Sequence, residues 1–453
     1  MARKKEKTLE EKLQEALVPE KQWPYILPEN WCWTRLKYIS KKISDGSHNP
    51  PKNSGSGIPL LSAANVCEFS IDMNSANRWI LEEEWVNENK RTCLEKGDVL
   101  LTIVATIGRV AIVENEKFAL QRSVAVIKPN QVLSKYLMYF LASPYIQAFM
   151  HNNAKGTAQK GFYLKSLEQL YIALPSLPEQ KRIVRRIESP FAKLDEAKEK
   201  IQQVLDGAEM RKAAILHKAF TGELTKNWRK ENGISEDSWE SVKLKELGEL
   251  NRGKSKHRPR NDPRLFNGPY PFIQTGDVSS SGMYIQKHSQ TLSEFGMQQS
   301  RLFPKDTLCI TIAANIGKVA ILTYDCCFPD SVVGFTPNER TFSKYMYYSM
   351  LKIQKEIEAL APAVAQKNLS LKLLLDVNVQ IPSVEEQHTI VKIIERLLKH
   401  EKNVISSSMR SIESIETMKK SILAKAFRGE LGTNNPTEYS ALNLLKEVLQ
   451  DKS

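Results

Sequence analysis

The sequence repeats itself in tandem, with an offset of about 207 to 212 residues between the copies. Residues 102–112 align without a gap on residues 311–321, and residues 218–224 align on residues 425–431. The pair Glu179-Gln180 returns as Glu386-Gln387 at a similar offset. So many separate matches at a near-constant offset indicate a duplication, and the copies of a duplication should fold alike. The chain is therefore predicted to form two similar lobes.

Each copy contains a region of mixed pattern followed by a long helical pattern. Short β-branched runs at residues 99–104, 110–113 and 124–127 predict strands, with turn residues between them. Residues 136–149 and 345–357 predict helices. The predicted fold class is therefore α+β, with a pseudo-two-fold tandem repeat of one globule.

Heptad repeats predict a long coiled-coil helix after each lobe. Both helices should end at a glycine, Gly222 in the centre of the chain and Gly429 near its end. Pro190 should break or kink the central helix near Ser189, because proline removes a backbone N–H and clashes with the preceding turn. The apolar heptad positions are Ile187, Leu194, Ile201, Ala208 and Ile215 in the central segment, and Val391, Leu398, Ile405 and Ile412 in the distal one.

Polar residues interrupt these seams at Lys198, Glu401 and Ser408. Two interpretations stay open for them, namely extension of the side chain into solvent or a role in fixing the helix register.

The predicted boundaries follow from these patterns. Apolar stripes on the terminal helices, such as Leu9, Leu13, Ala16 and Leu17, indicate either docking surfaces or burial in the coiled coil. The predicted segments are an N-terminal helix at 1–22, a first lobe at 23–177, a central helical spacer at 178–226, a second lobe at 236–383, a distal helical spacer at 384–432 and a C-terminal helix at 437–453.

The chain is strongly basic, with a formal net charge of +13 and a pI near 9.2. A basic excess favours a polyanionic partner, although a soluble basic protein would show the same balance. There is no signal peptide and no run long enough to span a bilayer, so the cytoplasm is the expected location, without a membrane partner. The six cysteines form no C-x-x-C pair, which predicts reduced thiols and argues against zinc.

Three motifs suggest catalysis, but their context does not support it. Residues 248–255 match the phosphate-loop pattern G-x-x-x-x-G-K-[ST], yet a basic, proline-containing loop follows where a helix N-terminus would be needed. Asn49-Pro50-Pro51 resembles an amino-methyltransferase motif, but Lys52 replaces the aromatic residue that stacks on a flipped base. Pro329-Asp330 lacks the acidic-x-Lys partner of a nuclease. No catalytic, cofactor or metal residue is therefore predicted on this chain.

Basic and polar loops are the candidate binding residues. Residues 251–264 carry six cations against Asp262 alone, and the corresponding loop of the first copy, residues 41–53, is very different. Two similar lobes that recognise different base sequences would be expected to differ in their binding loops in this way. A solvated charged face or a structural loop is the alternative. The candidates are Lys41, Lys42, Ser47, His48, Asn49, Lys52, Asn65, Gln159 and Lys160 in the first copy, and Arg252, Lys254, Ser255, Lys256, Arg258, Arg260, Thr275, Gln366 and Lys367 in the second.

The length of the central helix suggests how two readers would be spaced. A helix over residues 190–217 would be about 40 Å long, which is close to one turn of DNA. The hypothesis is that a helical rod holds two basic lobes so that they read sites about one turn apart.

Nearly the whole chain resembles the DNA-specificity subunits of type I restriction-modification systems. The most specific elements are residues 216–224 and 422–431, and Pro178-Glu179-Gln180 is similar to the start of the family's helices. Residues 45–48 and 57–62 resemble one class of first target-recognition domain. Residues 252–255 and 270–277 resemble a class of second domain. Pro190 departs from the family's uninterrupted central helix.

The resemblance implies a non-catalytic subunit with two target-recognition domains on an antiparallel helical pair. Each domain would read one part of a split, asymmetric site in double-stranded DNA. Two methylation subunits and two restriction subunits are the implied partners, and S-adenosylmethionine, ATP and Mg²⁺ would be bound by them. The alternatives are a self-sufficient DNA methyltransferase or nuclease with degenerate motifs, and a scaffold that binds DNA without sequence preference.

Overall fold

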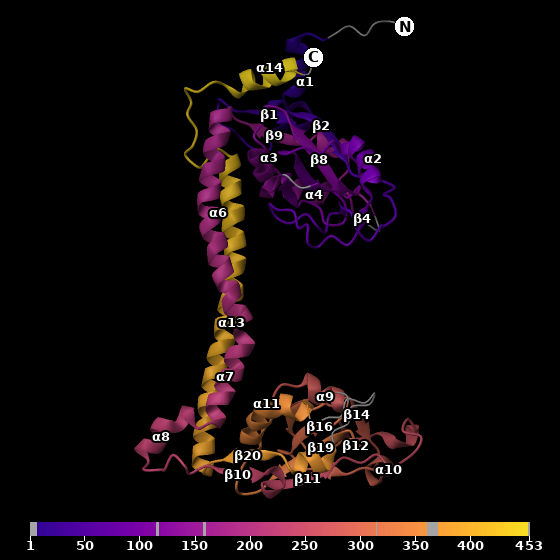
Figure 1. Cartoon of the computed structure of the whole chain (residues 1–453), viewed down its shortest axis with the longest axis vertical. Helices are drawn as coiled ribbons and strands as arrows, with labels where there is room; N and C mark the ends of the chain where they lie inside the picture. The colour runs from indigo at the N-terminus through magenta and orange to yellow at the C-terminus, as the bar shows by residue number, and fades with distance from the viewer. Residues whose placement is uncertain (1–6, 115–116, 157–159, 314, 360–369, 452–453) are drawn as a thin grey trace. The chain divides into compact units, whose positions relative to one another are not determined.

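The computed structural model describes residues 7–114, 117–156, 160–313, 315–359 and 370–451. The chain divides into two compact units (Figure 1). Unit 1 consists of Met1–Ile201 together with Arg410–Ser453, and unit 2 consists of Gln202–Met409. Each unit therefore contains one copy of the mixed region together with helical segments from both long helical stretches. None of the described helices is long and apolar enough to cross a membrane.

Unit 1 is built on an antiparallel sheet in the order β2-β8-β5-β6. Its central residues Val99, Leu100 and Leu101 are fully buried, because helices and a smaller sheet cover both faces. The strands are β1 (Cys32–Arg35), β2 (Ser40–Asp45), β3 (Ile58–Leu61), β4 (Trp79–Ile80), β5 (Val99–Thr102), β6 (Val110–Ile112), β7 (Ala119–Leu120), β8 (Val124–Pro129) and β9 (Tyr171–Leu174). The helices are α2 (Glu82–Thr92), α3 (Ser134–Leu141), α4 (Pro144–Asn153) and α5 (Leu164–Glu168).

Unit 2 repeats this sheet as β11-β19-β16-β17 and adds β13 at the edge. The register also repeats, since Leu101 pairs with Val110 in unit 1 and Ile310 with Val319 in unit 2. The strands are β10 (Glu240–Lys243), β11 (Gly248–Arg252), β12 (Phe266–Phe272), β13 (Tyr284–Ile285), β14 (Gln290–Leu292), β15 (Leu302–Phe303), β16 (Leu308–Thr311), β17 (Val319–Leu322), β18 (Cys326–Cys327), β19 (Val332–Pro337) and β20 (Asn378–Ile381). The helices are α8 (Lys226–Glu231), α9 (Thr275–Ser280), α10 (Glu294–Gln298), α11 (Ser343–Ala359) and α12 (Leu371–Leu375).

The heptad segments form the helices α6 (Leu177–Asp206), α7 (Ala208–Phe220) and α13 (Val384–Phe427). Within unit 1, Lys198 pairs with Glu416 at 2.5 Å, and Asp195 pairs with Lys419 at 2.5 Å. The partner's number falls as the α6 number rises, so these segments run antiparallel. Within unit 2, Arg211 pairs with Glu401 at 2.9 Å. The polar residues Lys198 and Glu401 therefore form cross-helix ion pairs, which favours the register-fixing interpretation.

Of the predicted break or kink near Ser189, the break is wrong. Helix α6 continues through Pro190, and the flanking residues Ile187 and Phe191 are buried in the unit 1 core. This packing offsets the helix-breaking cost of an internal proline, about 3 kcal/mol. The interruption falls at Gly207 instead, where φ is −76° and ψ is −4°.

The terminal helices α1 (Leu9–Ala16) and α14 (Ala441–Asp451) both belong to unit 1. Ala16, Leu445 and Val448 are fully buried in the core cluster that also contains the ends of α6 and α13. A backbone hydrogen bond of 3.0 Å from Ala441 to Asn30 attaches α14 to the start of the domain. Burial of the apolar stripes is therefore favoured over the docking-surface interpretation.

The repeated Glu-Gln pair is buried at the start of both long helices. The Glu386 carboxylate accepts hydrogen bonds from Arg229 (2.6 Å), Thr225 (2.6 Å) and Trp239 (3.1 Å). The equivalent Glu179 instead pairs with Arg182, one turn along its own helix, and accepts from Thr433 at 2.7 Å. The same buried acid is thus neutralised by arginines from different places in the two copies.

Candidate nucleic-acid interface

The first candidate surface follows edge strand β2 of unit 1. Lys41 and Lys42 are exposed on β2, and Lys42 Nζ donates to the Arg91 carbonyl oxygen at 2.6 Å. At the end of β2 the nearly buried Asp45 carboxylate pairs with Arg91 and lies 2.8 Å from His48 Nε2. This pairing holds the exposed His48 ring at the start of the loop. The ring and the two lysines are therefore among the accessible polar groups of this surface.

The other unit 1 candidates fall into exposed and buried groups. Asn49, Lys52 and Lys160 are exposed. Ser47 is buried and bonded through its backbone to Leu120 and Arg122. Asn65 is also buried, with its Oδ1 accepting from the Ser62 backbone N–H at 2.9 Å and its Nδ2 donating to Ser75 at 3.0 Å.

Ser47 is therefore held in a β-bridge to Gln121 and Asn65 in a turn, and sequence reasoning did not anticipate that these two residues are buried. Gln159, Gln366 and Lys367 lie outside the described residues.

The second candidate surface is the basic loop between β11 and β12 of unit 2. Arg252, Lys256, Arg258 and Arg260 are exposed, whereas Lys254 and Ser255 are half-buried. The loop holds its own cations, since Arg258 Nη1 donates to the Ser255 carbonyl oxygen at 2.6 Å and Arg260 pairs with Asp330 at 3.1 Å. These interactions leave much of each guanidinium exposed, which suits contact with phosphate or with guanine edges.

Asp262 is the acidic residue of this loop, and its hydrogen bonds hold the end of the loop that leads into β12. It pairs with Arg264 at 2.7 Å and lies 2.8 Å from His257 Nε2. The hydrogen bond from the Arg264 side chain is the main cause that holds the pKa of Asp262 well below its usual range. The carboxylate therefore stays ionised and offsets one cation of the loop at any physiological pH.

Residues 248–255 match the phosphate-loop sequence pattern, but they do not have the strand–loop–helix geometry that a phosphate loop needs. The first five form strand β11, and Gly253 then packs so tightly that a Cβ would lie 2.3 Å from the Phe328 carbonyl oxygen. Lys254 and Ser255 continue as an extended loop, and the next helical turn starts at Pro263. A nucleotide phosphate would thus meet no helix N-terminus after Ser255.

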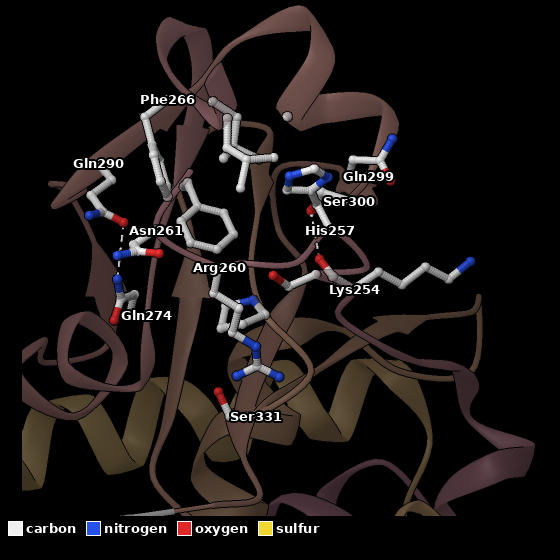
Figure 2. Close-up of a pocket in the computed structure, with 16 residues that line it drawn as sticks. Lys254, His257, Arg260, Asn261, Phe266, Gln274, Gln290, Gln299, Ser300 and Ser331 are labelled. Atoms are coloured by element: carbon white, nitrogen blue, oxygen red, sulfur yellow. Dashed lines mark hydrogen bonds between the residues drawn. The ribbon is translucent and has the colours of Figure 1, made fainter. Parts of the chain in front are cut away.

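A pocket of about 580 Å³ opens beside the basic loop of unit 2 (Figure 2). Lys254 and Arg260 of the loop line it together with the aromatic side chains Phe266 and Phe272. Across from them, Gln274 Nε2 donates to Gln290 Oε1 at 3.0 Å. Thr275, the neighbouring candidate, is half-buried at the first turn of α9. Sequence reasoning missed Gln274 and Gln290 because they are 16 residues apart and meet only through the fold.

Among the described residues, no group of three or more His, Cys, Asp or Glu side chains is arranged to hold a metal ion. The described cysteines are free thiols, and burial raises the pKa of Cys326 to about 12. Cations, amides and hydroxyls lie at these surfaces together with the paired carboxylates of Asp45, Asp262 and Asp330, and the excess of cations suits binding of an anionic partner.

Comparison with known proteins finds a match to the family model described as type I restriction modification DNA specificity domain, over residues 40–206 and 236–407. The specificity subunit of the type I restriction enzyme EcoBI from Escherichia coli is 33% identical over 213 residues, which cover 46% of this chain and 44% of that protein. The specificity subunit of the Escherichia coli K12 enzyme EcoKI matches at 28% identity over 46% of this chain and 47% of that protein. These alignments thus span about half the length of either relative.

A putative specificity subunit from Methanocaldococcus jannaschii, MjaX, is 25% identical over 89% of this chain and 94% of that protein. Among solved structures, a chain from a study of type I R-M complex assembly has a TM-score of 0.65 at 17% identity, covering 90% of this chain and all of that one. The HsdS subunit from Thermoanaerobacter tengcongensis has a TM-score of 0.56 at 17% identity with the same coverage. With the repeated sheet order, these matches confirm the predicted fold class of two similar α+β domains with long antiparallel helices.

Proposed function

Because this chain belongs to the family of type I restriction modification DNA specificity domains, we propose that it is a non-catalytic subunit that reads a split, asymmetric target in double-stranded DNA. The repeated sheet with two different loops is the observation that carries this proposal. Strands β2 and β11 occupy equivalent edges of equivalent sheets, and the loops that follow them differ in charge and sequence. One scaffold with two different loops suits the reading of two different half-sites.

The proposed partners follow from the relatives, which are named as specificity subunits of type I restriction enzymes. We propose that two methylation subunits and two restriction subunits assemble on this chain in the cytoplasm. S-adenosylmethionine, ATP and Mg²⁺ would then be bound by those subunits.

Footprinting and a methylation assay test this proposal together. The assembled complex should protect two short DNA patches separated by a gap of indifferent sequence. A scaffold without sequence preference would give no defined patches. The purified chain alone, supplied with S-adenosylmethionine and unmethylated DNA, should transfer no methyl groups; methylation without partners would support the alternative of a self-sufficient enzyme.

Replacing Arg258 and Arg260 together by alanine should weaken DNA binding and flatten its dependence on salt. Each phosphate contact contributes about 0.9 to the slope of log K against log salt, so the slope should fall by up to about 2. The measurement is a binding titration of the assembled complex at several salt concentrations.

The matched control replaces Lys193 and Lys200, exposed lysines of α6, by alanine and removes the same charge. An unchanged slope in the arginine variant would exclude phosphate contact by this loop.

A further inference from the structure

The Gln274–Gln290 pair lies at a pocket that the phosphate contacts proposed above do not explain. We propose that Gln274, held in place by Gln290, reads an adenine in the half of the target contacted by unit 2. The inference rests on the proposed function and adds to it the base that this position selects.

Hydrogen bonds hold both the backbone and the side chain of Gln274. Its backbone N–H donates to Asp277 Oδ2 at 2.7 Å, and the same carboxylate oxygen accepts from Ser289 Oγ at 2.8 Å. Its side-chain Nε2 donates to Gln290 Oε1 at 3.0 Å. Asp277 therefore ties the start of α9 to the segment leading into β14, which carries Gln290. The two glutamines are exposed at the pocket although their positions are fixed by the fold.

This arrangement leaves the amide of Gln274 with a defined hydrogen-bonding edge. A primary amide has two N–H donors and an oxygen acceptor, and the bond to Gln290 uses one N–H. The remaining N–H and Oε1 match the N7 acceptor and the N6 amino donor of adenine in the major groove. A free glutamine amide can turn over and exchange its donor and acceptor. While Gln290 presents its oxygen to this pair, only the nitrogen end of Gln274 can bond to it, and the Gln274 oxygen then faces away from Gln290.

The surroundings place this amide beside groups that suit DNA. Lys254 and Arg260 line the same pocket, so phosphate contacts and a base contact can come from one surface (Figure 2). An amide that is already oriented loses less conformational freedom on binding than a free one. Gln274 is thus the reading residue of this proposal, and Gln290 is a positioning residue.

The test determines the DNA sequence motif that the full complex methylates. The chain is co-expressed with its methylation subunits, and the host genome is sequenced for methylated bases. With Gln274→Met, the preference for adenine at one position in one half of the motif should fall by roughly 5- to 150-fold, while the other half stays unchanged. Gln274→Arg should shift the same position toward guanine, because arginine pairs with guanine O6 and N7.

The Gln290 variants separate positioning from a general structural role. Gln290→Met removes the acceptor and should relax the same position, whereas Gln290→Glu keeps an acceptor oxygen and should retain adenine. Gln286→Met is the matched control, because Gln286 is an exposed glutamine of the same unit that does not line the pocket.

The outcomes separate this inference from the proposed function. A wild-type genome without a split methylated motif overturns both. An intact wild-type motif that neither Gln274 variant alters overturns the inference alone. If Gln274→Met abolishes methylation altogether, the arginine variant decides: a shift toward guanine supports reading by this residue, and retained adenine excludes it.

Discussion

Replacement of Arg229 by methionine is expected to lower the free energy of unfolding by about 3–5 kcal/mol, because it leaves a buried carboxylate without its cation. The Glu386 side chain is 1% exposed and the Arg229 side chain 7%, and their closest atoms are 2.6 Å apart. Arg229 also donates to the Gly222 carbonyl oxygen at 2.8 Å, where α7 ends. The variant therefore removes a contact to a helix end in addition to the charge. Urea unfolding of the purified chain measures the difference.

Two further variants show whether the buried charge is the cause. Arg229→Met combined with Glu386→Leu should recover much of the loss, since replacing both members of a buried pair by apolar residues is often close to neutral. Glu196→Gln breaks the exposed pair with Lys200 and should change stability by less than about 1 kcal/mol. If Arg229→Met lowers the free energy of unfolding by as little as Glu196→Gln does, the buried Glu386 charge is not the cause of the predicted loss.

Insertion of one heptad into both long helices should lengthen the gap between the recognised half-sites by about three base pairs and abolish recognition of the original site. Seven helical residues add about 10 Å and preserve the seam. The insertion must be matched, because Lys198–Glu416 and Asp195–Lys419 fix the antiparallel register within unit 1. The insertions would follow Lys198 in α6 and precede Glu416 in α13. Sequencing the methylated motif gives the gap directly.

The control for this experiment lengthens α6 alone. That change displaces every later cross-helix ion pair, such as Arg211–Glu401, by one heptad from its partner, so assembly rather than spacing should be lost. A matched insertion that leaves the gap unaltered would rule out a spacer role for these helices, while the reading of the half-sites by the two domains would stand.

Local patterns in the sequence were sufficient to predict the duplicated α+β fold and the long helices. The β-branched runs became β5, β6 and β8, and the heptads became α6, α7 and α13, because side-chain periodicity is a local property of the chain. The candidate surfaces were predictable only in part. The basic loop of unit 2 is visible in composition, whereas the burial of Ser47 in a β-bridge and of Asn65 in a turn is not.

The amino-acid sequence by itself determined the repeat, the charge and the periodicity of each element, since these depend on neighbouring residues. The tertiary structure decided which distant groups meet. It placed Arg229 on Glu386, 157 residues away, and Gln274 on Gln290, and it buried Ile187 and Phe191 so that α6 continues through Pro190. Such contacts depend on how strands and helices pack across long separations. The energy of a buried charge or an internal proline is set by that packing, which the residue types alone do not encode.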